Sequence, residues 1–172
     1  MSDKLSRYAP LPLRLILGFG FLFHGLPKLG SGHAGFVGML TGIGVPAPGL
    51  MAYVVGLVES LGGLALLLGA FVAIASLPLI MNMLVAMFTV HLPAGFSFMN
   101  MTGMGPDGPT FGMPGYEVPL LYIAGLAGLA LIGAGTLSVD GMRKGKSGGV
   151  VAAAVTNATA AEIPPGSCRP PC

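Results

Sequence analysis

The stretch G56-L-V-E-S-L-G-G63 places Glu59 in the middle of an apolar run, Leu50 to Met81, that contains no other charged residue. A carboxylate at the centre of a lipid bilayer costs about 2.5–3.5 kcal/mol on insertion scales, so an unpartnered one is not expected there. The position of Glu59 therefore predicts that its side chain turns toward a neighbouring helix and finds a partner on it.

The composition is that of a membrane protein. Of the 172 residues, 53% are hydrophobic and 8% are charged, whereas about a quarter of the residues of a soluble domain are charged. The 29 glycines, the absence of Trp and a mean hydropathy of +0.84 fit helices that pack closely in lipid. The net charge of +2 comes from basic residues near the two ends of the chain, so no nucleic-acid partner is implied.

Apolar runs long enough to cross a bilayer, which takes about 20 residues each, occur four times in the sequence. The second and third adjoin, so they predict a helical hairpin that turns near Gly69 and Ala70, where glycine can end a helix. The predicted fold class is an all-α membrane protein with a bundle of four transmembrane helices. The predicted spans are Leu11–Leu29, Gly49–Ala70, Phe71–Leu92 and Val118–Leu137.

The distribution of basic residues predicts the topology. The loops 30–48 and 93–117 contain no Lys or Arg, so the positive-inside rule puts both termini in the cytoplasm and both loops outside. We expect a multi-pass protein of the cell inner (plasma) membrane, whose first span is a retained anchor and not a signal peptide. The basic residues near the ends are Lys4, Arg7, Arg14, Arg143, Lys144 and Lys146.

Three regions are predicted: a cytoplasmic N-terminus (1–10), a transmembrane domain (11–140) and a cytoplasmic tail (141–172). The loop 93–117 is rich in Gly, Pro and Met, which favours irregular structure over a strand. The tail is low in complexity and is expected to be disordered. It ends with Cys168 and Cys172, a C-x3-C pair compatible with metal or disulfide chemistry but diagnostic of neither.

Polar residues share one face on each of the first three predicted helices. Helical spacing joins Arg14, His24 and Lys28 on the first helix. Glu59 lies between Gly56 and Gly63 on the second helix, and Asn82 lies on the third. If Phe21 marks the midplane, His24 lies about 4.5 Å from it and Arg14 and Lys28 about 10 Å, so His24 is the best partner of Glu59 by depth. The long side chains of Arg14 and Lys28 either bend inward or extend to the two interfaces, and Asn82 can supply a donor near mid-depth. These five polar residues predict a pocket for a small ligand or for protons.

The residues R14-L-I-L-G-F-G-F-L-F-H-G-L-P-K-L29, G44-V-P-A-P-G49 and G56-L-V-E-S-L-G-G63 resemble the DoxX family of small bacterial membrane proteins. The resemblance covers roughly residues 11–137. It implies four transmembrane helices and Arg14, Lys28 and Glu59 as signature polar positions, without an established catalytic role for any of them. Relatives are named for a subunit of a thiosulfate:quinone oxidoreductase, which implies quinone as a cofactor and a redox protein as a partner.

Three readings of Glu59 follow from the residues. Its carboxylate makes a structural ion pair or hydrogen bond between helices, acts as a protonatable group that relays protons or binds a quinone head group, or lies on a path for a substrate. The leading hypothesis is a membrane subunit of a redox system, quinone-linked and dependent on partners for electrons. No catalytic residue is assigned, because the sequence contains no P-loop, dinucleotide fingerprint, H-E-x-x-H or serine elbow.

Two further hypotheses come from other classes of protein. Thioether and imidazole groups suit Cu(I). The end of the third predicted helix and the loop after it therefore suggest a transporter or a copper-handling protein. Its weak candidate metal ligands are His91, Met99, Met101 and Met104. Against it, Met is an ordinary gap-filling residue. A membrane scaffold for a soluble oxidoreductase and a homo-oligomer also remain open.

Overall fold

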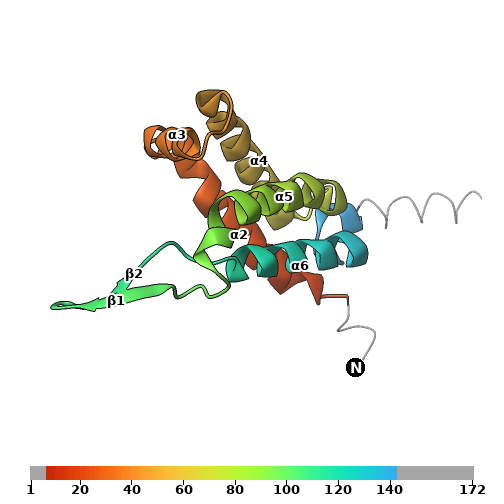
Figure 1. The fold of residues 1–172 in the computed structure, drawn as a ribbon. Helices are drawn as coiled ribbons and strands as arrows, with labels where there is room; N and C mark the ends of the chain where they lie inside the picture. Colours follow the sequence, from red (N-terminus) through yellow and green to blue (C-terminus); the bar gives the residue numbers. More distant parts are fainter. Residues whose placement is uncertain (1–6, 143–172) are drawn as a thin grey trace, which may run out of the picture.

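The computed structural model describes residues 7–142, and the fold is mostly helical (Figure 1). The predictions for the tail, including those for Cys168 and Cys172, concern residues outside this range. The helices are α2 (Pro10–Leu29), α3 (His33–Gly42), α4 (Pro48–Leu68), α5 (Val72–Ala86), a π-helical turn η1 (Met87–His91), a 3-10 turn η2 (Leu92–Ala94) and α6 (Glu117–Ile132). The strands are β1 (Met101–Gly105) and β2 (Gly108–Phe111).

Within residues 7–142, three helical segments are long and apolar enough to cross a membrane: α2, α4 and the continuous segment Val72–Ala94. They match the first three predicted spans to within two residues at each end. The fourth differs, because α6 ends at Ile132 and has 16 residues. Gly133 stops the helix there with a φ of 87°, a conformation that an α-helix cannot contain.

The outer surfaces of these helices are apolar. Leu61, Ile74 and Leu131 are 63%, 67% and 88% exposed. Each lies on a different helix, so the exposure is spread around the bundle and is not confined to one patch. A surface of this kind suits contact with lipid chains.

The predicted turn between the second and third helices is confirmed. Gly69 adopts a left-handed conformation with a φ of 66°. The backbone N–H groups of Gly69 and Ala70 return to the carbonyls of Leu66 and Ala65, which is the Schellman arrangement that ends many helices. Asp140 caps the start of α5. Its carboxylate oxygens accept hydrogen bonds from the backbone N–H groups of Phe71 and Val72 at 2.9 and 3.1 Å.

Replacing Asp140 with Ala is expected to lower the free energy of unfolding by about 1 kcal/mol, the usual cost of removing a side chain that caps a helix. Asp140→Asn keeps one acceptor oxygen and should lose about half as much. Thermal unfolding in detergent, followed by circular dichroism, measures both changes. Equal stability of Asp140→Ala and the wild type would show that the carboxylate does not stabilise this turn.

Helices α2 and α4 run antiparallel with their backbones in close contact at Gly18 and Gly63. A Cβ atom built on Gly63 would lie 2.7 Å from the carbonyl oxygen of Gly18, and one built on Gly18 would lie 2.8 Å from that of Gly63. Seven residues further along α2, Gly25 lies against the backbone of Ser60 in α4. Seven residues before Gly63 in α4, Gly56 lies against the side chain of Leu29 in α2. Small residues therefore set how near the two helices lie.

The loops 30–48 and 93–117 contain regular structure that the sequence did not predict. The loop 30–48 contains α3, which packs on α4 and α2. The loop 93–117 contains the antiparallel pair of strands β1 and β2, so the prediction of irregular structure without strands was wrong. The pairing runs from Met101 opposite Phe111 to Gly105 opposite Gly108. Gly108 has a φ of 117°, which only glycine tolerates readily and which permits the tight reversal.

The bundle has a tightly packed end and an end with a cavity. The packed core unites residues of α2, α4, α5 and α6, with Phe21 at its border with the cavity. Both ends of the described chain lie at the packed end, where the backbone N–H of Thr136 donates to the carbonyl of Arg7. Figure 1 shows α3 and the strands at the opposite end. The core residues are Leu17, Phe21, Leu66, Val72, Leu79, Leu126, Leu129 and Ala134.

Candidate functional site

Glu59 lies inside the bundle, with its side chain 3% exposed. Its Cβ is level with Gly25 of α2, since a Cβ built on Gly25 would lie 2.8 Å from it. One oxygen of the carboxylate, Oε2, contacts Lys28 Nζ at 2.5 Å. The other, Oε1, accepts a hydrogen bond from Asn82 Nδ2 at 2.8 Å. The carboxylate therefore joins α2, α4 and α5.

Lys28, and not His24, is the partner that the structure gives to Glu59. The expectation for His24 took Phe21 as the level of the carboxylate, but the close contact of α2 and α4 sets that level at Gly25. Lys28 is then three residues away, or about 4.5 Å along the axis, which its long side chain spans. The ammonium also lies 4.7 Å from the centre of the Phe36 ring, a cation–π contact with α3.

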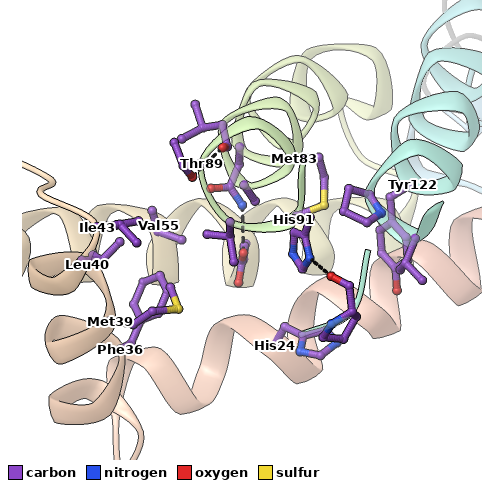
Figure 2. A pocket seen from close by; sticks show the side chains of 18 of the residues that line it. His24, Phe36, Met39, Leu40, Ile43, Val55, Met83, Thr89, His91 and Tyr122 are labelled. Atoms are coloured by element: carbon purple, nitrogen blue, oxygen red, sulfur yellow. Dashed lines mark hydrogen bonds between the residues drawn. The ribbon is translucent and has the colours of Figure 1, made fainter. Parts of the chain in front are cut away.

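A cavity of about 480 Å³ lies beside this network. Its walls come from α2, α3, α4, the end of α5 with η1, the loop after the strands and the start of α6. Figure 2 shows side chains of α3 along one side and Met83, His91 and Tyr122 along another. The lining is mostly apolar, with a few polar groups placed in it, as in sites for small organic ligands. Those polar residues are His24, Lys28, Glu59, Asn82, Thr89, His91 and Tyr122.

Exposed side chains mark where the cavity opens. Ile43 after α3 is 41% exposed and Val85 of α5 is 56% exposed. Phe98 and Met113 in the loop segments flanking the strands are 54% and 52% exposed. The floor is closed where the rings of Phe21 and Tyr122 meet edge to face, 5.2 Å between centroids. Access is thus from the end of the bundle that carries α3 and the strands.

His24 lies at the rim of the cavity. It is exposed, although it is one of the lining residues. Its ring meets that of Phe23 edge to face at 5.6 Å. His24 can therefore contact a bound molecule, but the two carboxylate oxygens of Glu59 are engaged by Lys28 and Asn82 instead.

The structure separates Arg14 from the other four predicted pocket residues. Arg14 lies near the opposite end of α2 and is not among the residues that line the cavity. Its guanidinium donates to the carbonyls of Leu66 at 3.1 Å, Leu137 at 2.8 Å and Ala134. Carbonyls at helix ends lack intrahelical donors, so Arg14 joins the end of α4 to the segment after α6. Arg14 was expected in the pocket, but its N–H donors bind these carbonyls and it does not line the cavity.

The proposed copper ligands do not share one environment. His91 lines the cavity, whereas Met99, Met101 and Met104 are 65%, 60% and 76% exposed in or beside β1. Within residues 7–142, no group of three or more His, Cys, Asp or Glu side chains is arranged to hold a metal ion. The copper hypothesis stays a prediction.

The sequence reasoning missed the contribution of α3 to the site. Four residues in and after this helix line the cavity. Their spacing of 3, 1 and 3 is that of one face of a helix, a signal that was available in the sequence. The segment was not predicted as a helix because it is short and contains three glycines. These residues are Phe36, Met39, Leu40 and Ile43.

Comparison with known proteins relates this chain to a family of membrane proteins. The family described as DoxX matches residues 9–92, which include Lys28, Glu59 and Asn82. The protein "Putative oxidoreductase CatD" of Bacillus subtilis (strain 168) is 31% identical over 152 residues, which are 88% of this chain and 99% of that protein. No solved structure matches. With apolar helices that can cross a membrane and a relative aligned along nearly its whole length, this chain belongs to the DoxX family of membrane proteins.

Proposed function

We propose that the chain is an integral membrane subunit of a redox system, linked to quinone, and that the cavity beside Glu59 binds the quinone head group. The observation that carries the proposal is the apolar cavity of about 480 Å³ with the network of Lys28, Glu59 and Asn82 on its wall. The resemblance to a protein named as an oxidoreductase supports the same class of function.

The chemistry of the cavity suits a quinone ring. Cavities of about 300–1,000 Å³ with an apolar lining hold small organic molecules. The ammonium of Lys28 has three N–H donors and directs one of them to Glu59. The others can donate to a quinone carbonyl oxygen, and buried charged donors bind such oxygens more strongly than neutral ones do.

Reduction of a quinone to a quinol takes up two electrons and two protons. In this proposal a partner redox protein supplies the electrons. Glu59 and Lys28 lie where protons must reach the ring, and they form the inner end of a proton path. His24 stands at the rim, where that path meets the opening of the cavity.

The proposed topology is four crossings of the inner membrane with both termini in the cytoplasm. The proximity of Arg7 and Thr136 supports it, because both ends of the described chain then face one side. With its 16 residues, α6 spans about 24 Å, less than the hydrocarbon core of about 30 Å. Local thinning of the bilayer accommodates such a difference at a modest cost. In this topology the cavity opens toward the outer side.

Replacing Glu59 with Gln tests the proposal. Gln keeps the size of the side chain and an acceptor for Asn82, but it removes the charge and the proton site. We expect quinone reduction by native membranes that carry this variant to fall about a hundredfold or more, since positioned acid–base groups contribute about 10²–10⁴-fold. The measurement is the rate of decylubiquinone reduction, normalised to the amount of the chain in the membrane.

Asp107→Asn is the matched control for this test. It also removes one carboxylate, but Asp107 is exposed in the turn between β1 and β2 and does not line the cavity. Its rate should equal that of the wild type. Unchanged quinone turnover in Glu59→Gln at normal expression would remove the carboxylate from the mechanism.

A further inference from the structure

His91 lies on the wall of the cavity at the end of the π-helical turn η1. Two residues later, Pro93 has no N–H to continue the helical pattern, and the chain passes into the 3-10 turn η2. Single π-helical turns inside a helix occur often at functional sites. In this chain the turn lies beside the cavity and contributes Thr89, Val90 and His91 to its lining.

A hydrogen bond to the backbone fixes the tautomer of His91. Its Nδ1 is 2.8 Å from the carbonyl oxygen of Pro114, shown as a dashed line in Figure 2. A carbonyl oxygen only accepts, so Nδ1 must carry the proton. In the neutral ring Nε2 then has a lone pair and no proton. No residue between 7 and 142 engages Nε2.

Beside the hydroxyl groups of its lining, the cavity therefore carries one group that only donates and one that only accepts. Lys28 provides donors, one of which binds Glu59. His91 provides an acceptor that cannot become a donor while the ring stays neutral and bound to Pro114. Both carboxylate oxygens of Glu59 are already occupied, by Lys28 and Asn82. A ligand that satisfies both kinds of group needs an acceptor oxygen and a hydroxyl hydrogen.

From this arrangement we infer that Nε2 of His91 accepts a hydrogen bond from a hydroxyl group of the bound ligand, so that the cavity binds a quinol more tightly than the corresponding quinone. The inference rests on the proposed function and specifies its ligand. A quinone offers only carbonyl oxygens, whose lone pairs would repel the lone pair of Nε2. A quinol has hydroxyl groups that donate to Nε2 and can still accept from Lys28.

The preference has a consequence for the redox chemistry. A net hydrogen bond contributes about 0.5–1.5 kcal/mol, so up to about tenfold in affinity. Tenfold tighter binding of the reduced form raises the potential of a two-electron couple by about 30 mV. The bound quinone is then easier to reduce than the free one.

The test uses the full chain in lipid nanodiscs under anaerobic conditions. Its three probes are decylubiquinol, decylubiquinone and the dimethyl ether of decylubiquinol, and binding is measured by native mass spectrometry. We expect the wild type to bind the quinol three- to tenfold more tightly than the quinone or the ether. His91→Phe keeps a flat ring without the acceptor, so it should lose this preference and bind the quinol, the quinone and the ether with similar affinities.

A second measurement does not depend on the folding of the variant. In wild-type protein labelled with 15N-histidine, the Nε2 resonance of His91 should be that of an unprotonated nitrogen and should shift on addition of the quinol but not of the ether. A protonated Nε2 or equal affinity for quinol and quinone would overturn the inference and leave the proposed quinone site standing. Failure of the wild type to bind any of the three probes would overturn both.

Discussion

Replacing Lys28 with Met is expected to lower the free energy of unfolding by about 3–5 kcal/mol, the usual cost of removing one partner from a buried ion pair. The size of this effect follows from burial. Glu59 is 3% exposed and is held between three helices, so it cannot turn to water when the ammonium is gone. Asn82 would be left to compensate a full negative charge with one hydrogen bond.

Glu59→Gln should cost less, about 1–3 kcal/mol. The side chain of Lys28 is 19% exposed and lines the cavity, so its ammonium can reach solvent there. The double variant Lys28→Met with Glu59→Gln contains no uncompensated charge, and it should be more stable than Lys28→Met alone. Equilibrium unfolding in mixed detergent micelles gives the four free energies of this cycle, from which the coupling of the two residues is obtained.

Equal destabilisation in Lys28→Met and in the double variant would contradict this account. It would mean that the loss comes from the contact of the lysine ammonium with the Phe36 ring and not from the unpaired carboxylate. Asp107→Asn serves again as the control for removal of an exposed charge, for which changes within about 0.5 kcal/mol are usual. The cycle thus separates an electrostatic effect at Glu59 from a general effect of altered charge.

Periodicity and composition were enough to predict the main helices, because the apolar runs and their glycine boundaries act locally. The turn at Gly69 is an example, since its left-handed conformation is one that glycine supplies. The prediction that Glu59 faces other helices also follows from a local fact, the cost of a charge in lipid. The structure places this side chain among α2, α4 and α5.

Which residue of α2 binds Glu59 could not be predicted, because it depends on the relative shift of α2 and α4 along their axes. That shift is set by where the glycines of α2 and α4 meet, a tertiary contact that the spacing within one helix does not contain. The same reason explains Arg14. Its place on the polar face of α2 is consistent with a pocket, but the end of α4 and the segment after α6 provide the carbonyls that bind it.

The cavity itself arises from short elements that the sequence treated as loops. Helix α3 contains ten residues with three glycines, and β1 and β2 contain five and four residues. Segments this short have weak intrinsic preferences, and packing on the rest of the protein decides their structure. Side chains of α3 and of the segments that flank the two strands line one end of the space beside Glu59, so the cavity could not be derived from the long helices alone.

Replacing Gly63 with Ala is expected to destabilise the protein by about 2–3 kcal/mol, a typical cost of inserting a methyl group into a filled interface. The new Cβ would lie 2.7 Å from the carbonyl oxygen of Gly18 and 2.8 Å from the backbone N of Leu22. Both neighbours are backbone atoms of α2, so no side chain can rotate away and the helices must separate. Thermal unfolding of the purified variant in detergent measures the loss.

Gly128→Ala is the matched control for Gly63→Ala. It is the same substitution inside a helix, but a Cβ built on Gly128 meets no atom within 4 Å. Because alanine favours helices over glycine by up to about 1 kcal/mol, this variant should be as stable as the wild type or more stable. If Gly63→Ala behaved like Gly128→Ala, the backbones of α2 and α4 would not be in contact. Since that contact aligns Glu59 with Gly25 and brings Lys28 within reach, the ion pair and the site built on it would then have to be placed differently.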